Sequence, residues 1–187
     1  MFEQTLKNID NILRKDAGCS TAIDYIEQTT WVLFLKYLDN LENDKKTAAE
    51  LSGGKYIPII ADEFKWNVWA APKLPDGKLD HHKAIGGDDL IQFVTQKLIP
   101  YLKKFKENSD KANTIEYKIG EVYNELTNRI QSGYNLREVI NLVDMLEFKT
   151  AEERHEMSHL YESKIKDMGN AGKNGGEYYT PRALIRS

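Results

Sequence analysis

The sequence predicts a mainly α-helical, multi-helix domain with one short irregular or β-containing insertion at about residues 52–87. Apolar residues recur at helical spacing in six segments. Glycine and proline concentrate in the stretch that separates the second segment from the third. The 187-residue length and the 41% hydrophobic content suit one medium-sized domain with a real core.

Two helices are expected at the N-terminus. Residues 2–15 carry apolar side chains on one face, and Asp16-Ala17-Gly18 ends that helix. The second helix is expected from about Ser20, which can act as its N-cap, to Leu41. Because the run from Trp31 to Leu35 makes this helix apolar almost all round, the sequence predicts a buried central helix.

The insertion at 52–87 lacks helical spacing and is rich in turn-forming residues. Glycine pairs stand at 53–54 and 86–87, and Pro75-Asp76-Gly77 marks a turn between them. Phe64, Trp66 and Val68 alternate with polar residues, which favours a short strand or extended segment.

Helical spacing returns in the second half of the chain. Helices are expected at 88–106, with a kink at Pro100, and then at 114–131, 136–147 and about 151–168. The domain is therefore expected to span residues 1–170.

Residues 171–187 are expected to form a linker and the first turn of a further domain. Thr180 is placed as an N-cap and Pro181 as the first helical residue, directly after Gly175-Gly176 and the aromatic pair Tyr178-Tyr179. Such a helix start suits a small ligand with a carboxylate and a flat ring. Because the helix has only about one turn before Ser187, the chain is expected to be a fragment that ends where its next domain begins.

Composition limits the function classes. A net charge of −3 excludes a polycationic nucleic-acid binder, so DNA contacts must come from local patches or partners. Cys19 is the single cysteine, which excludes an internal disulfide and fits the cytoplasm. The N-terminus lacks the features of a signal peptide, and the longest apolar run is too short to cross a membrane.

One motif offers a metal-dependent alternative. His155-Glu156-Met157-Ser158-His159 matches the H-E-x-x-H pattern of zinc peptidases, in which two histidines bind zinc and the glutamate activates water. However, helical spacing puts both histidines opposite the apolar face, where side chains are normally solvated. The pattern is therefore interpreted as a coincidence, and no metal ligand is assigned.

The other candidates have structural interpretations. His81-His82 is expected in a surface loop, and Trp66 and Trp69 are expected to anchor the insertion to the core more than to stack on a ligand. Cys19 is expected to be buried or near a helix cap. A further stretch is interpreted as a solvated helix end, although it could touch phosphate: Lys103, Lys104, Lys106 and Lys111, diluted by Glu107 and Asp110. No catalytic residue is assigned.

A family resemblance brings these segments together. The stretch from Glu153 to Glu162, followed by Gly172-Lys173-Asn174-Gly175-Gly176-Glu177-Tyr178-Tyr179-Thr180-Pro181-Arg182, resembles the modification (M, or HsdM) subunit of type I restriction–modification systems. Residues 22–26, 34–39 and 131–136 resemble the N-terminal helical domain of that subunit. In this family the helix that carries H-E-x-x-H is a structural lead-in to the Glu-Tyr-Tyr-Thr-Pro-Arg signature.

The resemblance implies an adenine-specific DNA methyltransferase that uses S-adenosyl-L-methionine and flips its target base out of the duplex. It also implies that six residues form one edge of the cofactor pocket: Glu177, Tyr178, Tyr179, Thr180, Pro181 and Arg182. The tyrosines would supply aromatic packing, and the helix start at Thr180–Pro181 would offer N–H groups to the methionine carboxylate.

The family's glycine-rich cofactor loop and its Asn/Asp-Pro-Pro-aromatic motif are not found in these 187 residues. The chain alone is therefore expected to be inactive and to serve DNA clamping and subunit contact. The partners implied are the specificity (S) subunit, a second modification subunit, the restriction (R) subunit and double-stranded DNA. The alternative is a non-catalytic helical interaction module.

Overall fold

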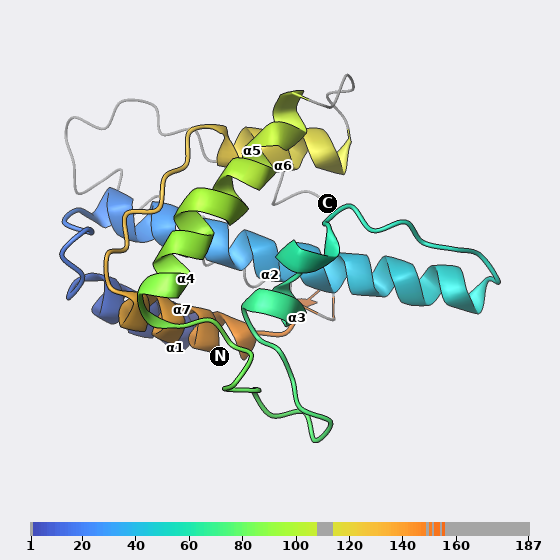
Figure 1. Ribbon diagram of the computed structural model, residues 1–187, viewed down its shortest axis with the longest axis horizontal. Helices are drawn as coiled ribbons and strands as arrows, with labels where there is room; N and C mark the ends of the chain where they lie inside the picture. Colours follow the sequence, from blue (N-terminus) through green and yellow to red (C-terminus); the bar gives the residue numbers. More distant parts are fainter. Residues whose placement is uncertain (1, 108–113, 149, 151, 154, 156–187) are drawn as a thin grey trace.

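The computed structural model describes residues 2–107 and 114–148, together with 150, 152, 153 and 155. Within them it is a helical bundle built around one long central helix (Figure 1). The mainly α fold class is confirmed. None of the described helices combines the length and the apolar content that crossing a bilayer requires.

Helix α1 (Phe2–Leu13) and helix α2 (Ala22–Leu51) form the N-terminal half of the bundle. Thr21, one residue after the expected Ser20, is the N-cap of α2, and it forms a capping box with Asp24. Trp31, Val32 and Leu38 are at most 2% exposed, which confirms the prediction of a buried central helix.

Helix α2 continues ten residues beyond the expected end at Leu41. We call the segment Asn43–Leu51 the overhang, because none of its residues is buried and it projects beyond the bundle (Figure 1). The chain turns back at Gly53, where φ is +73°, a conformation that glycine adopts without steric cost. Leu51 and Ile57 are 86% and 84% exposed at this end of the molecule.

The insertion contains helical turns where a strand was predicted. A 3₁₀ turn, η1 (Asp62–Phe64), leads into the short helix α3 (Trp66–Trp69). The prediction of a strand at 64–68 was wrong because the apolar positions follow a helical turn: Trp66 and Trp69 face the core, whereas Val68 is 47% exposed. The β structure among the described residues is one isolated antiparallel bridge between Lys73 and Leu79.

Helix α4 (Gly87–Phe93), the π-helical turn η2 (Val94–Leu98) and helix α5 (Ile99–Glu107) form one rod across the bundle (Figure 1). The predicted irregularity at Pro100 takes the form of this π turn, in which the N–H of Ile99 donates to the carbonyl of Val94. Proline cannot donate a helical hydrogen bond, so the turn before it widens.

Helix α6 (Ile115–Asn124) packs against α5, and helix α7 (Gly133–Asp144) packs against α1, α2 and α4. The expected helix at 114–131 ends early: α6 stops at Asn124, and residues 126–132 connect it to α7 without regular secondary structure. Gly133 starts α7 against Gly87, where an added Cβ would lie only 1.9 Å from the Gly87 carbonyl oxygen. Residues 152, 153 and 155 are helical, within the range expected for the last helix.

Candidate functional site

The residues predicted from the signature, Glu177–Arg182, lie outside the described residues. Of the H-E-x-x-H pattern the structure describes His155, which is helical and exposed. Glu156, Met157, Ser158 and His159 lie outside the described residues, as does Lys111. Across the described ranges, no group of three or more potential ligands is placed to hold a metal ion.

The two tryptophans of the insertion anchor it to the core, as predicted. Trp66 and Trp69 are 3% and 1% exposed and contact each other edge to face. The indole N–H of Trp69 donates to the Phe64 carbonyl at 3.1 Å, and that of Trp66 donates to Asp144 Oδ1 at 2.8 Å. With both polar edges satisfied inside the protein, neither ring is available to stack on a ligand.

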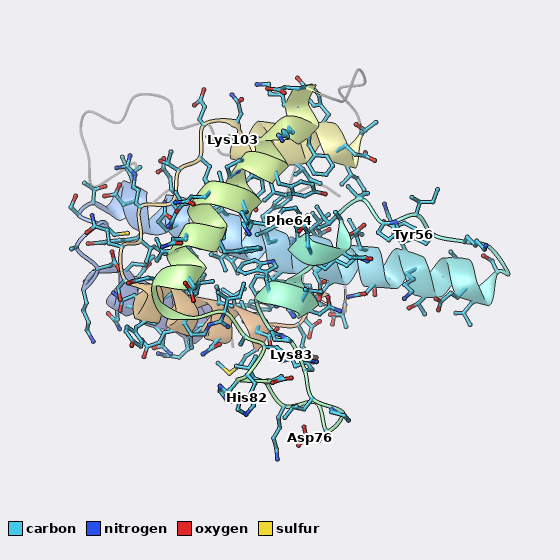
Figure 2. The ribbon with its side chains drawn as sticks, in the orientation of Figure 1. Tyr56, Phe64, Asp76, His82, Lys83 and Lys103 are labelled. Carbon is cyan, nitrogen blue, oxygen red and sulfur yellow. The ribbon has the colours of Figure 1, made fainter. Side chains whose placement is uncertain are left out.

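Cys19 and the histidine pair also match their structural interpretations. Cys19 is 4% exposed, and burial, with Asp16 and Asp24 nearby, raises the pKa of its thiol to about 11. The thiol is therefore protonated at neutral pH and is a poor nucleophile. His81 and His82 are exposed after the Lys73–Leu79 bridge, and Figure 2 shows His82 beside Lys83 on the projecting part of the insertion.

Asp16 joins the start of the chain to α7. Its carboxylate accepts hydrogen bonds from the backbone N–H groups of Gly18, Gln131 and Ser132 at 2.9–3.0 Å, and from the side-chain amide of Asn135 at 2.9 Å. Burial by itself would raise the pKa of Asp16, but these donors outweigh it and the pKa is lowered. A carboxylate with four donors is a structural anchor and not a catalytic base.

Asp144 joins the end of α7 to the insertion and to α2. Lys36 Nζ lies 3.0 Å from Asp144 Oδ1, and Lys73 and the Trp66 indole also donate to this carboxylate. Burial would raise the pKa of Asp144, but the three donors lower it overall. Two turns earlier in α7, Arg137 donates to the carbonyls of Ala70 at 2.5 Å and Ile85 at 2.6 Å. Together these contacts hold both ends of residues 70–85 against α7.

A small cavity lies between α2 and the insertion. It has about 10 Å³ of space, enough for one water molecule. Asp39 and Glu42 line it from α2, and Phe64, Lys65 and Trp66 are among the lining residues from the insertion. Glu42 accepts from the Ile59 N–H at 2.5 Å and from the Tyr56 hydroxyl at 3.2 Å, and Figure 2 shows Tyr56 and Phe64 on this side of α2.

The pKa of Asp39 in this cavity is shifted. Burial raises its pKa to about 6; Lys36 acts against the shift, and Glu42 and Asp144 add to it. A carboxyl with a raised pKa is a general-acid candidate. However, a space for one water admits neither a nucleobase nor a cofactor, so we assign it no catalytic step.

Sequence reasoning did not find the roles of Asp16, Asp39, Asp144 or Arg137. Each looks like an ordinary polar position of a helix or loop, and its partners are distant in sequence. The local signal that could have been read is the Asp-Ala-Gly turn after α1, because an aspartate often binds the backbone two residues on. The N–H of Gly18 does donate to Asp16 in this way.

The comparisons with known proteins agree with this fold. A family model described as the HsdM N-terminal domain matches residues 2–143. The methylase subunit of the Escherichia coli type I restriction enzyme EcoEI is 34% identical over 185 residues, which are 99% of this chain and 35% of that subunit.

Two solved structures are similar as well. One is the modification subunit assigned to a type I restriction enzyme of Vibrio vulnificus, with a TM-score of 0.78, 31% identity, and coverage of 99% of this chain and 38% of that one. The second comes from work on complex assembly and conformational transition of the type I restriction–modification system, with a TM-score of 0.70, 28% identity, and coverage of 97% and 33%.

This chain thus spans about a third of the length of the relatives that it matches. The family model covers α1 to α7 almost completely, and the similarity to the methylase subunit extends over nearly all of the chain. The chain belongs to the family of N-terminal domains of type I restriction–modification methylase (HsdM) subunits.

Proposed function

We propose that the chain is the N-terminal part of an enzyme that transfers a methyl group from S-adenosyl-L-methionine to the exocyclic amine of adenine in DNA. The observation that carries the proposal is the similarity to a methylase subunit over 99% of the chain, a stretch long enough to include most or all of the signature. The methyl donor, when bound, would supply the transferred group. The target base would have to leave the stack, because the amine cannot be reached inside a duplex.

The signature residues would hold one edge of the cofactor. The helix start at Thr180 and Pro181 would present free backbone N–H groups to the methionine carboxylate. Tyr178 and Tyr179 would pack on the flat part of the molecule, while Glu177 and Arg182 would contact it or pair with each other. The cavity beside Asp39, with about 10 Å³, is far too small to serve as an alternative cofactor site.

The helical domain would act through partners. These would be the specificity subunit, a second modification subunit, the restriction subunit and double-stranded DNA. A relative of this chain was solved in work on assembly of the type I restriction–modification system, which supports a role in subunit contact. The overhang of α2 supports it too, because it projects from the bundle and exposes Leu51.

The experiment measures the affinity of the complete subunit for S-adenosyl-L-methionine and compares the wild type with two variants. We expect Tyr179→Ala and Pro181→Ala each to weaken S-adenosyl-L-methionine binding about tenfold, which corresponds to about 1.4 kcal/mol. Tyr134→Ala is the matched control, because Tyr134 is a tyrosine of α7 that is 80% exposed. Unchanged affinity in both signature variants would contradict the proposed cofactor role. The 187-residue chain alone is expected to methylate no DNA, and turnover by it would contradict its proposed inactivity.

A further inference from the structure

The rod formed by α4, η2 and α5 carries four lysines that have no ion-pair partner among the described residues: Lys97, Lys103, Lys104 and, next to Glu107 at the end of the rod, Lys106. Lys97 and Lys104 are exposed and Lys103 is partly exposed. Lysines elsewhere are mostly paired: those with a carboxylate within 4 Å are Lys7, Lys36, Lys46, Lys65, Lys73, Lys78 and Lys83. We call Lys97, Lys103 and Lys104 the lysine face. Figure 2 shows Lys103 on the upper part of the rod.

The lysine face stands on a rigid support. On the opposite side of the rod, Leu98, Ile99 and Leu102 are at most 4% exposed. Tyr101 stacks on Phe64 with 4.1 Å between ring centroids, and its hydroxyl accepts a hydrogen bond from the Ala61 N–H at 2.9 Å. Because the helix is fixed on two sides, its lysines project from a fixed backbone.

The spacing of the lysines suits several separate negative charges. Lys97 and Lys104 are seven residues apart, which places them about 10 Å apart along the helix axis and near one side of it. One strand of duplex DNA carries a phosphate about every 3.4 Å of helix rise. The two ammonium groups would therefore reach different phosphates.

The surroundings of the lysine face are polar. Thr95 is exposed and accepts a hydrogen bond from the side-chain amide of Asn128 at 3.3 Å, which brings segment 126–132 beside the rod. Hydroxyl and amide groups of this kind accompany lysine at phosphate contacts. Lysine is depleted at the centre of protein–protein interfaces, so a protein partner fits this face less well. Glu107 limits the face at the end of the rod.

We propose that Lys97, Lys103 and Lys104 bind the phosphate backbone of duplex DNA. This inference rests on the proposed function, since it assigns one of the DNA contacts of the complete methyltransferase to a particular surface of this domain. It also agrees with the net charge of −3, because a local group of unpaired cations can bind phosphate where the whole chain would not attract it.

The experiment measures DNA affinity as a function of salt. The complete modification subunit, assembled with its specificity subunit, carries Lys97→Gln, Lys103→Gln and Lys104→Gln together. Binding to a random-sequence duplex is measured between about 50 and 200 mM salt. We expect the slope of log affinity against log salt to fall in magnitude by about 2 to 3, and affinity at about 150 mM salt to fall roughly 10- to 100-fold.

The matched control removes the same charge elsewhere. It combines Lys15→Gln, Lys45→Gln and Lys55→Gln, which are also lysines without an ion pair among the described residues, and its slope is expected to fall by less than about 1. An equal change in slope in both triple variants would overturn the inference. Loss of subunit assembly with an unchanged slope would also overturn it, because the face would then bind protein.

A separate measurement tests the proposed function independently of the lysine face. Methyl transfer to adenine by the unmodified enzyme, measured at low salt with saturating DNA, tests that function alone. If the enzyme transferred no methyl group but the slope still fell only in the lysine-face variant, the inference would stand without the proposed function.

Discussion

The pKa values of two aspartates of the domain are shifted in opposite directions, although burial acts to raise both. Asp16 is surrounded by four hydrogen-bond donors, so its ionised form is favoured and its pKa is lowered. Asp39 lies beside Glu42 in the cavity and receives one side-chain donor, Asn43, at 3.3 Å, and its pKa is raised to about 6. The number of donors, and not burial alone, therefore decides the sign of the shift.

The charge on Asp39 is expected to destabilise the fold at neutral pH. Its folded pKa of about 6 exceeds the unfolded value, so its favourable contribution is complete below about pH 4 and is lost as the pH rises through 6. We expect Asp39→Asn to raise the free energy of unfolding by about 1–2 kcal/mol at pH 8, after allowance for partial solvent screening.

Urea unfolding at pH 8 and pH 4.5 measures this effect. The gain from Asp39→Asn should shrink towards zero at the lower pH, where the wild-type carboxyl is largely protonated. Asp62→Asn is the control, because the Asp62 side chain is 90% exposed and should show little change at either pH. An equal gain from Asp39→Asn at both pH values would contradict the expected role of its charge.

Single residues differ in how well the sequence predicts them. The roles of Trp66, Trp69 and Cys19 could be predicted because large aromatic residues and a lone cysteine are usually buried. The partners of Asp144 could not be predicted, since Trp66 and Lys73 are 78 and 71 residues away in the chain. Nothing in the local sequence distinguishes an aspartate that will meet three donors from one that stays solvated.

The contact between α5 and α6 depends on a glycine. A Cβ added to Gly120 would lie 2.2 Å from the backbone nitrogen of Lys106. The two helices therefore approach closely enough for backbone to meet backbone. Because the lysine face is carried by α5, this contact also helps to fix the position of Lys103 and Lys104.

Gly120→Ala is expected to lower the free energy of unfolding by about 2 kcal/mol, even though alanine favours helix formation by up to about 1 kcal/mol. The cause is the steric clash with α5. Gly54→Ala is the matched control, because its added Cβ would make only ordinary contacts, the nearest at 3.5 Å. Chemical denaturation of both variants checks this, and a neutral or stabilising effect of Gly120→Ala would show that α5 can move aside without cost.

Helices were predicted more reliably in their number and order than in their ends. Leu41 looked like the end of α2 because the apolar pattern stops there, but polar residues with good helix propensity, including the Lys46–Glu50 pair, continue the helix to Leu51. The opposite error occurred after α6, where Leu126 and Ile130 continue the apolar spacing although the backbone is not helical. At both ends, the apolar pattern alone misplaced the end of the helix.

At the scale of the whole molecule, Asp16 joins the two ends of the helical bundle in sequence. It links the turn after α1 to residues 131–135, more than 110 positions further along the chain. Asp16→Ala removes the acceptor of several partly buried N–H donors and is expected to lower the free energy of unfolding by about 3 kcal/mol. Asp62→Ala, which removes an exposed ion pair, should change the free energy of unfolding little.

The pH dependence of this effect has a defined sign. Because the folded pKa of Asp16 is lowered, its contribution is complete above the unfolded value near 4 and is lost as the pH falls through the folded value. The difference in unfolding free energy between wild type and Asp16→Ala should therefore narrow below about pH 4. A difference that stays constant down to pH 2 would show that lost packing, and not the charged hydrogen bonds, is responsible.

The candidate site was predictable only as a motif. The assignment of Glu177–Arg182 to the cofactor pocket rests on the family resemblance together with the local capping pattern and the aromatic pair, and it stays a prediction. The lysine face could not be recognised with the same certainty, because whether a lysine is paired depends on neighbours from other elements. In the sequence, Glu107 and Asp110 stand close to the lysines; in the fold, Lys97, Lys103 and Lys104 have no carboxylate partner among the described residues.

The overhang of α2 gives the domain a lever. Its nine residues extend about 13 Å beyond the last buried turn, and an α-helix transmits rotation along its length without bending much. A rotation of about 10° at the base of α2 would therefore displace Leu51 by about 2 Å. The same continuous helix carries Trp31, which is fully buried, so a movement of the exposed tip would act on the packing at the centre of the core.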